Sequence, residues 1–98
     1  MKIRFCWDPV KAETNWHDHQ VRFEVAARVF ADPFALVVQD RIENGEARWQ
    51  TLGVVEGFLV LLVAHTVSED DDGTEVIRII SARRADRKER KRYEQSNR

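Results

Sequence analysis

The chain has 98 residues, 43% of them hydrophobic, which is enough for one compact domain with a core and excludes global disorder. Its net charge of -1 hides an asymmetry: residues 83–98 carry eight basic and three acidic side chains, whereas the rest of the chain is acidic. A single cysteine, Cys6, excludes an intramolecular disulfide and favours a reducing compartment. No signal peptide is visible, and no apolar run approaches the roughly 20 residues that span a bilayer. We therefore expect a cytoplasmic bacterial protein without a membrane segment.

The first elements are a strand and a helix. Residues 2–6 alternate polar and apolar side chains, which predicts a half-buried strand. Asp8 and Pro9 are typical of a helix start, because Asp8 can accept hydrogen bonds from free backbone N–H groups and Pro9 lacks one. We expect this helix to run from Pro9 to about Asp18. Its expected core contacts are Val10, Ala12 and Trp16.

A second helix follows, with apolar residues at the spacing of one helical face. These residues are Phe23, Ala26, Ala27 and Phe30. Asp32-Pro33 ends the helix, because the residue before a proline avoids the helical region. Arg22 lies at its expected start and provides no side-chain cap.

The rest of the chain reads as four strands and a last helix. The strands are expected at residues 34–39, 47–55, 58–67 and 76–82, with turns at Asn44-Gly45, Glu56-Gly57 and Gly73. The helix is expected at about 84–95. Short turns favour antiparallel pairing, and the last two strands are apolar enough to be central. We predict a single α+β domain over residues 1–98, of order β-α-α-β-β-β-β-α. Two N-terminal helices and a basic C-terminal helix within 83–98 would pack on a small antiparallel sheet.

Two strand residues are candidates for chemistry. Arg78 lies on a largely apolar strand, so it is either paired in a structural salt bridge or turned toward a ligand. His65 shares a strand face with Leu61 and Val63, so it is either a satisfied core histidine or a general acid or base. His17 and His19 point apart on a helix, and no second cluster supports them as metal ligands.

The basic helix is the strongest candidate for binding an anion. It has almost no apolar face, so it is either a solvated helix or a surface for a phosphate backbone. An acidic protein surface is an equally physical partner. The expected RNA-binding residues are Arg84, Arg87, Lys88, Arg90 and Lys91.

Several blocks of the sequence resemble the BrnT family of type II toxin–antitoxin toxins. The blocks are WDPVKAETN at 7–15, HQVRFEVAARVFADPFAL at 19–36, GEARWQTLG at 45–53, LLVAHT at 61–66 and IRIISARRADRKERKRYE at 77–94. They occur in order and cover nearly the whole chain.

The resemblance implies a fold like that of the RelE ribonuclease toxins and a role in cleaving RNA, without a metal or cofactor, to block translation. It implies a BrnA-type antitoxin as partner, a toxin–antitoxin heterotetramer, and contact with DNA only through the antitoxin. The implied catalytic residues are Arg48, His65, Arg78, Arg83 and Tyr93. Of these, we expect Arg78 and Arg83 to bind phosphate, and His65 or Tyr93 to move protons.

The sequence also departs from the family pattern. Ser68 occupies a position that is often arginine, and DHQVRF replaces the usual KHGVSF before the second helix. The alternative hypothesis is therefore a non-catalytic or inactivated module. Its basic helix would bind an acidic protein or a nucleic-acid backbone.

Overall fold

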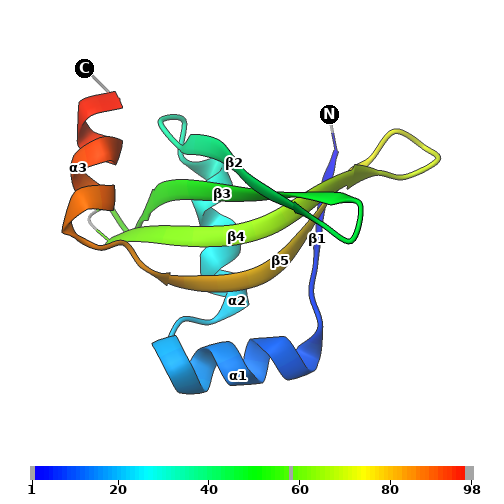
Figure 1. Cartoon of the computed structure of the whole chain (residues 1–98), viewed down its shortest axis with the longest axis horizontal. Helices are drawn as coiled ribbons and strands as arrows, with labels where there is room; N and C mark the ends of the chain where they lie inside the picture. Colours follow the sequence, from blue (N-terminus) through cyan, green and yellow to red (C-terminus); the bar gives the residue numbers. More distant parts are fainter. Residues whose placement is uncertain (1, 58, 97–98) are drawn as a thin grey trace.

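The computed structural model describes residues 2–57 and 59–96. The elements in chain order are β1 (Ile3–Cys6), α1 (Pro9–His19), α2 (Phe23–Ala26), the 3₁₀ helix η1 (Ala27–Ala31), β2 (Leu36–Glu43), β3 (Glu46–Val55), β4 (Leu59–Glu69), β5 (Glu75–Arg84) and α3 (Arg87–Ser96) (Figure 1). This order confirms the predicted β-α-α-β-β-β-β-α fold. The predicted second helix is one short α turn continued by the 3₁₀ helix, and Phe58, expected to open a strand, lies outside the described residues.

The five strands form one sheet of order β1-β5-β4-β3-β2. The pairs from β2 to β5 are antiparallel, as expected. β1 adds to β5 in parallel, so the complete sheet is mixed. The predicted turns adopt the left-handed backbone that favours Asn and Gly, with φ of 53° at Asn44 and 78° at Gly45.

The helices α1, α2 and η1 cover one face of the sheet, with α2 behind the strands in the view of Figure 1. The core lies between them, where Phe23, Ala26 and Val29 pack with Leu61, Val63 and Ile79. The η1 backbone comes so close to β3 that a Cβ built on Gly53 would lie 2.8 Å from the Cβ of Val29. Gly53 is therefore required by packing.

The first helix begins as predicted, with the Asp8 side chain accepting a hydrogen bond from the Val10 N–H at 2.8 Å. Its expected core contacts are partly wrong. Val10 is 72% exposed and Trp16 is 39% exposed, with the guanidinium of Arg22 stacked 4.1 Å from the Trp16 ring. The buried residue of α1 is Asn15.

Asn15 completes the edge of the sheet. β1 ends opposite Arg78, so β5 has no neighbouring strand at Ala82. The Asn15 side chain takes that place: its Nδ2 donates to the Ala82 carbonyl at 2.8 Å and its Oδ1 accepts from the Ala82 N–H at 2.9 Å. Nδ2 also donates to the Val21 carbonyl at 2.9 Å, so one amide satisfies three buried backbone groups.

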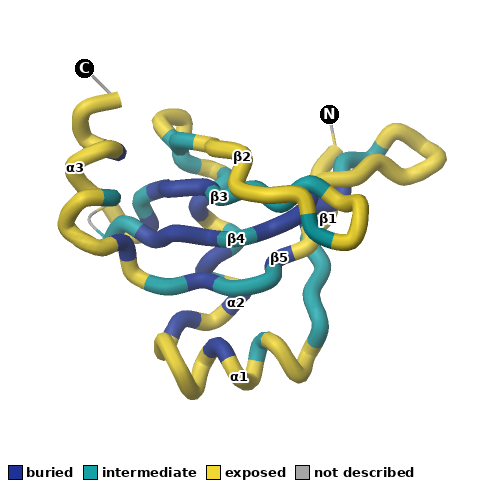
Figure 2. Tube along the Cα trace, viewed as in Figure 1, coloured by how far each residue is buried: buried dark blue, intermediate teal, exposed yellow. Residues whose placement is uncertain are grey.

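The basic helix α3 begins at Arg87, three residues later than predicted, because β5 continues through Arg84. Asp86 and Glu89 form a reciprocal capping box, each accepting a hydrogen bond from the other's backbone N–H. Tyr93 of this helix packs against Leu52 and Leu62. Ala85, which precedes the helix, belongs to the same cluster. Its remaining surface is exposed (Figure 2). None of the described helices has the length and apolar character of a membrane span.

Candidate functional site

The two faces of the sheet differ in what covers them. The helix-covered face, defined above, carries His65, Thr51 and the core residues. The other face is covered only at one end, by α3, and we call it the open face. Strand register assigns to it the side chains of Arg48, Gln50, Thr66, Arg78, Ser81 and Arg83.

Arg48, Thr66 and Arg78 lie in one row across the open face. Thr66 pairs directly with Arg78. Trp49 pairs with His65, so the neighbouring residues Arg48 and Thr66 also lie side by side, and their side chains point to the other face of the sheet from those of Trp49 and His65. The Cα atoms of the two arginines are thus about two strand spacings, or about 10 Å, apart. A phosphate above Thr66 is within reach of both long side chains.

Both arginines have guanidinium N–H donors that make no hydrogen bond within the described chain. Arg78 is exposed and makes no hydrogen bond or ion pair within the described chain. This places it outside the core and excludes the structural salt bridge considered from sequence. The Nε of Arg48 is buried without a hydrogen-bond partner among residues 2–57 and 59–96, and lies 3.9 Å from Glu43.

Arg83 lies on the same face but is already paired. Its guanidinium donates to both carboxylate oxygens of Glu89, at 2.8 and 3.0 Å. The hydrogen bond and charge of Glu89 raise the pKa of Arg83, and those of Arg83 lower the pKa of Glu89. The pair joins β5 to α3, so Arg83 fixes the helix that borders the open face.

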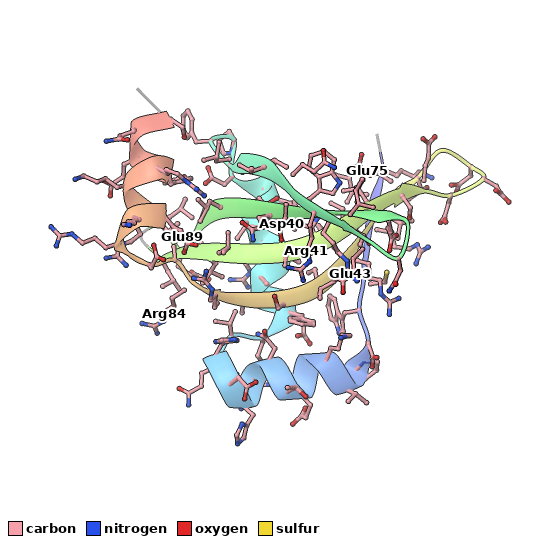
Figure 3. The ribbon with its side chains drawn as sticks, viewed as in Figure 1. Asp40, Arg41, Glu43, Glu75, Arg84 and Glu89 are labelled. Carbon is pink, nitrogen blue, oxygen red and sulfur yellow. The ribbon has the colours of Figure 1, made fainter. Side chains whose placement is uncertain are left out.

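A β-bulge brings more charge to this face. Gln39 pairs with Trp49 and Ile42 with Ala47, so Asp40 and Arg41 together oppose the single residue Arg48. Asp40 accepts a long hydrogen bond from Gln50, at 3.5 Å, and lies 3.9 Å from Arg41. Figure 3 shows Asp40, Arg41 and Glu43 close together over the middle strands.

His65 is separated from the arginines by the sheet. It is 2% exposed on the helix-covered face, where its Nε2 is 2.7 Å from the Thr51 hydroxyl and its ring meets Phe30 edge to face. Burial lowers the pKa of His65, although a hydrogen bond to the Thr66 carbonyl partly opposes the change. The apolar depression beside it, about 250 Å³, has Glu75 as its charged residue and does not suit a phosphate.

Tyr93 borders the open face and points into the protein. It is 8% exposed, and its hydroxyl donates to Asp32, which also accepts from the N–H groups of Val54 and Phe34 at 2.8 and 2.9 Å. Burial raises the pKa of Asp32, but these three hydrogen bonds outweigh it and the net pKa is lowered. Tyr93 therefore anchors α3 to the loop after η1.

The expected RNA-binding residues divide between two locations. Arg84 is a β5 residue paired with Leu61, so it points to the helix-covered side near Trp16 and Arg22. Arg87, Lys88 and Lys91 are exposed on α3, and Arg90 donates to the Ala85 carbonyl at 3.0 Å. The exposed cations of α3 extend the positive charge of the open face.

The sequence did not reveal the roles of four residues in the structure: Asn15, Asp32, Asp40 and Glu89. The Asp86-x-x-Glu89 spacing could have shown the capping box, whereas the bulge at Asp40 has no sequence signal. Ser68 lies on the open face, opposite Val76 near the far end of β4. Within the described ranges, no group of three His, Cys, Asp or Glu residues is placed to hold a metal ion.

Comparison with known proteins gives a family and a fold. The family described as "Ribonuclease toxin, BrnT, of type II toxin-antitoxin system" matches residues 7–89. Among solved structures, the crystal structure of the Brucella abortus ribonuclease toxin BrnT is similar, with a TM-score of 0.67 and 23% sequence identity. The match covers 89% of this chain and 100% of that one. No curated protein sequence matches significantly.

Proposed function

Because the chain belongs to the BrnT family of type II toxin–antitoxin ribonuclease toxins, we propose that it cleaves RNA on the open face of its sheet and thereby blocks translation. The family itself implies an RNA target and an antitoxin partner. The observation that carries the location is Arg78, an exposed guanidinium without an intramolecular partner in the described chain, in one row with Arg48.

Metal-free RNA cleavage requires charge stabilisation at phosphorus. As the 2′-oxygen attacks, negative charge builds up on the phosphoryl oxygens, and preorganised guanidinium groups stabilise it with charge-assisted hydrogen bonds. Arg48 and Arg78 lie on the same face of the sheet, in the row that contains Thr66, which supports them as the phosphate-binding pair. Their function needs no metal ion or cofactor.

The other expected catalytic residues take supporting roles in this proposal. Arg83, paired with Glu89, holds the start of α3, and Tyr93 holds its later turns through Asp32. His65 is a neutral core histidine that orders β3 against β4. The exposed cations Arg87, Lys88 and Lys91 bind the RNA backbone beyond the cleaved bond, and Arg90 fixes the first turn of α3.

The antitoxin acts by covering the same surface. A BrnA-type antitoxin with an acidic segment would neutralise the open face and α3 together, since both are positively charged. We propose that the pair assembles as a heterotetramer in the cytoplasm and touches DNA only through the antitoxin.

Expression of the chain alone tests the proposal. The wild-type chain is expected to arrest growth and to degrade transcripts, whereas an Arg48→Ala/Arg78→Ala chain is expected to do neither. Lys11→Ala, which removes an exposed charge from α1, is the control and is expected to remain toxic. RNA cleavage by purified protein is expected to survive EDTA.

The alternative is a binding module without activity, favoured by Ser68 on the open face and by the pairing of Arg83 with Glu89. Harmless expression of the folded wild-type chain, together with RNA binding but no cleavage, would establish that alternative and contradict the ribonuclease proposal.

A further inference from the structure

The proposed reaction needs a group that accepts the proton of the attacking 2′-hydroxyl. His65 is buried on the helix-covered face, and the Tyr93 hydroxyl donates to Asp32. Neither reaches a phosphate held by Arg48 and Arg78. The acceptor must therefore come from another residue whose side chain reaches the open face.

The bulge in β2 supplies such a residue. Because Asp40 and Arg41 both oppose Arg48, the bulge redirects side chains that regular alternation would send to opposite faces. The Asp40 carboxylate then lies beside Gln50, in the strand that carries Arg48, and its side chain remains 35% exposed. Bulges of this kind commonly re-aim a side chain next to an active site.

Other carboxylates on this face are less suited. Glu89 has both oxygens on Arg83. Glu43 accepts from the Arg41 Nε at 3.2 Å and pairs with Glu46 beside the β2–β3 turn, at the edge of the face. Asp40 has only the 3.5 Å contact with Gln50 and the 3.9 Å contact with Arg41 within the described chain, so its oxygens are available.

Resting on the proposed ribonuclease function, we infer that Asp40 is the general base of the reaction. The phosphate lies over the Arg48–Thr66–Arg78 row, and the ribose on its 5′ side lies over β2. Asp40 takes the proton of the 2′-hydroxyl, the 2′-oxygen forms a bond to phosphorus, and the bond from phosphorus to the 5′-oxygen breaks. The departing 5′-oxygen takes a proton from water, leaving a 2′,3′-cyclic phosphate and a 5′-hydroxyl.

Charged side chains of β2 and β3 lie near Asp40 on the open face. Arg41 follows Asp40 on the same strand, Arg48 opposes it on β3, and Glu43 lies beside both arginines.

Single-turnover cleavage of a short RNA by the purified, antitoxin-free chain tests the inference. Asp40→Asn is expected to lower the rate at least about 100-fold, the usual contribution of general base catalysis. It is expected to bind a 2′-deoxy-substituted, uncleavable form of the RNA as tightly as the wild type. Asp71→Asn, on the exposed β4–β5 loop, is the matched control and is expected to be unchanged.

Circular dichroism establishes that each variant is folded, and Asp40→Ser takes the place of Asp40→Asn if the latter is not. Asp40→Glu keeps a carboxylate and is expected to recover part of the rate. If the wild type cleaves and the neutral variant cleaves equally fast, the assignment of Asp40 is wrong while the ribonuclease function stands. If the wild type itself does not cleave, the proposed function fails as well.

Discussion

At the scale of single residues, Asn15 stabilises the edge of the sheet through its side-chain amide. Its amide replaces a missing strand at Ala82 and satisfies the Val21 carbonyl. Asn15→Ala is expected to reduce the free energy of unfolding by about 3 kcal/mol, because three buried backbone groups lose their partner. Urea unfolding measures this, with Thr14→Ala, one residue away on the exposed side of α1, expected to cost far less. Equal losses for both variants would contradict the role of Asn15.

Residue roles were only partly predictable. Alternation correctly assigned His65 to the side of Leu61 and Val63, but it did not show that this side is covered by η1. Arg78 was expected on an apolar face and is exposed, because no helix covers the open face at that point. Strand periodicity gives the face of a residue, whereas the partner that covers the face is set by tertiary packing.

At the scale of elements, the contact of η1 with β3 depends on a missing side chain. A Cβ at position 53 would lie 2.8 Å from the Val29 Cβ and 2.9 Å from its carbonyl oxygen. Gly53→Ala is expected to lower the free energy of unfolding by about 1–3 kcal/mol through overpacking. Chemical denaturation measures the loss, and an unchanged midpoint would show that η1 moves away from β3 at little cost.

The docking of α3 is expected to depend on pH. The folded-state pKa of Asp32 lies below its ordinary value of 3.8. The stability it contributes is therefore present above that value and is lost as pH falls through the folded-state pKa. Asp32→Asn is expected to be less stable than the wild type at pH 7, with the difference shrinking toward pH 3. Urea unfolding midpoints of both chains, recorded between pH 7 and pH 3, measure the difference in stability. The contribution of His65 to the pH dependence is the same in both chains and cancels in this difference. A constant difference would contradict the assignment.

The elements themselves were largely predictable, and the exceptions have physical causes. Caps, turn residues and apolar periodicity predicted the order of the helices and strands, although the second helix continues as the 3₁₀ helix η1 and α3 begins three residues later than expected. The bulges at Asp40 in β2 and at Ile80 in β5 were not predictable, because they arise from pairing with a neighbouring strand. The parallel pairing of β1 depends on where the helices return the chain, which local sequence does not encode.

At the scale of the whole molecule, charge is separated along the sheet. The α3 end is basic, while the β4–β5 loop at the other end carries Asp70, Asp71 and Asp72. RNA binding is therefore expected to weaken steeply with salt. Replacing Arg87, Lys88 and Lys91 by Gln is expected to flatten the slope of log K against log salt by about 2, since each phosphate of a single strand that the protein neutralises contributes about 0.7. Lys11→Gln is the control, and an unchanged slope in the triple variant would exclude α3 from the RNA interface.

We propose that RNA binds to the open face of the sheet. The most direct measurement is an NMR titration of the chain with a short RNA made uncleavable by 2′-deoxy substitution. We expect the largest chemical-shift changes on Arg48, Thr66 and Arg78, and no change at the amides of α1. Changes centred on His65 and the depression beside it, with none in the Arg48–Thr66–Arg78 row, would contradict it.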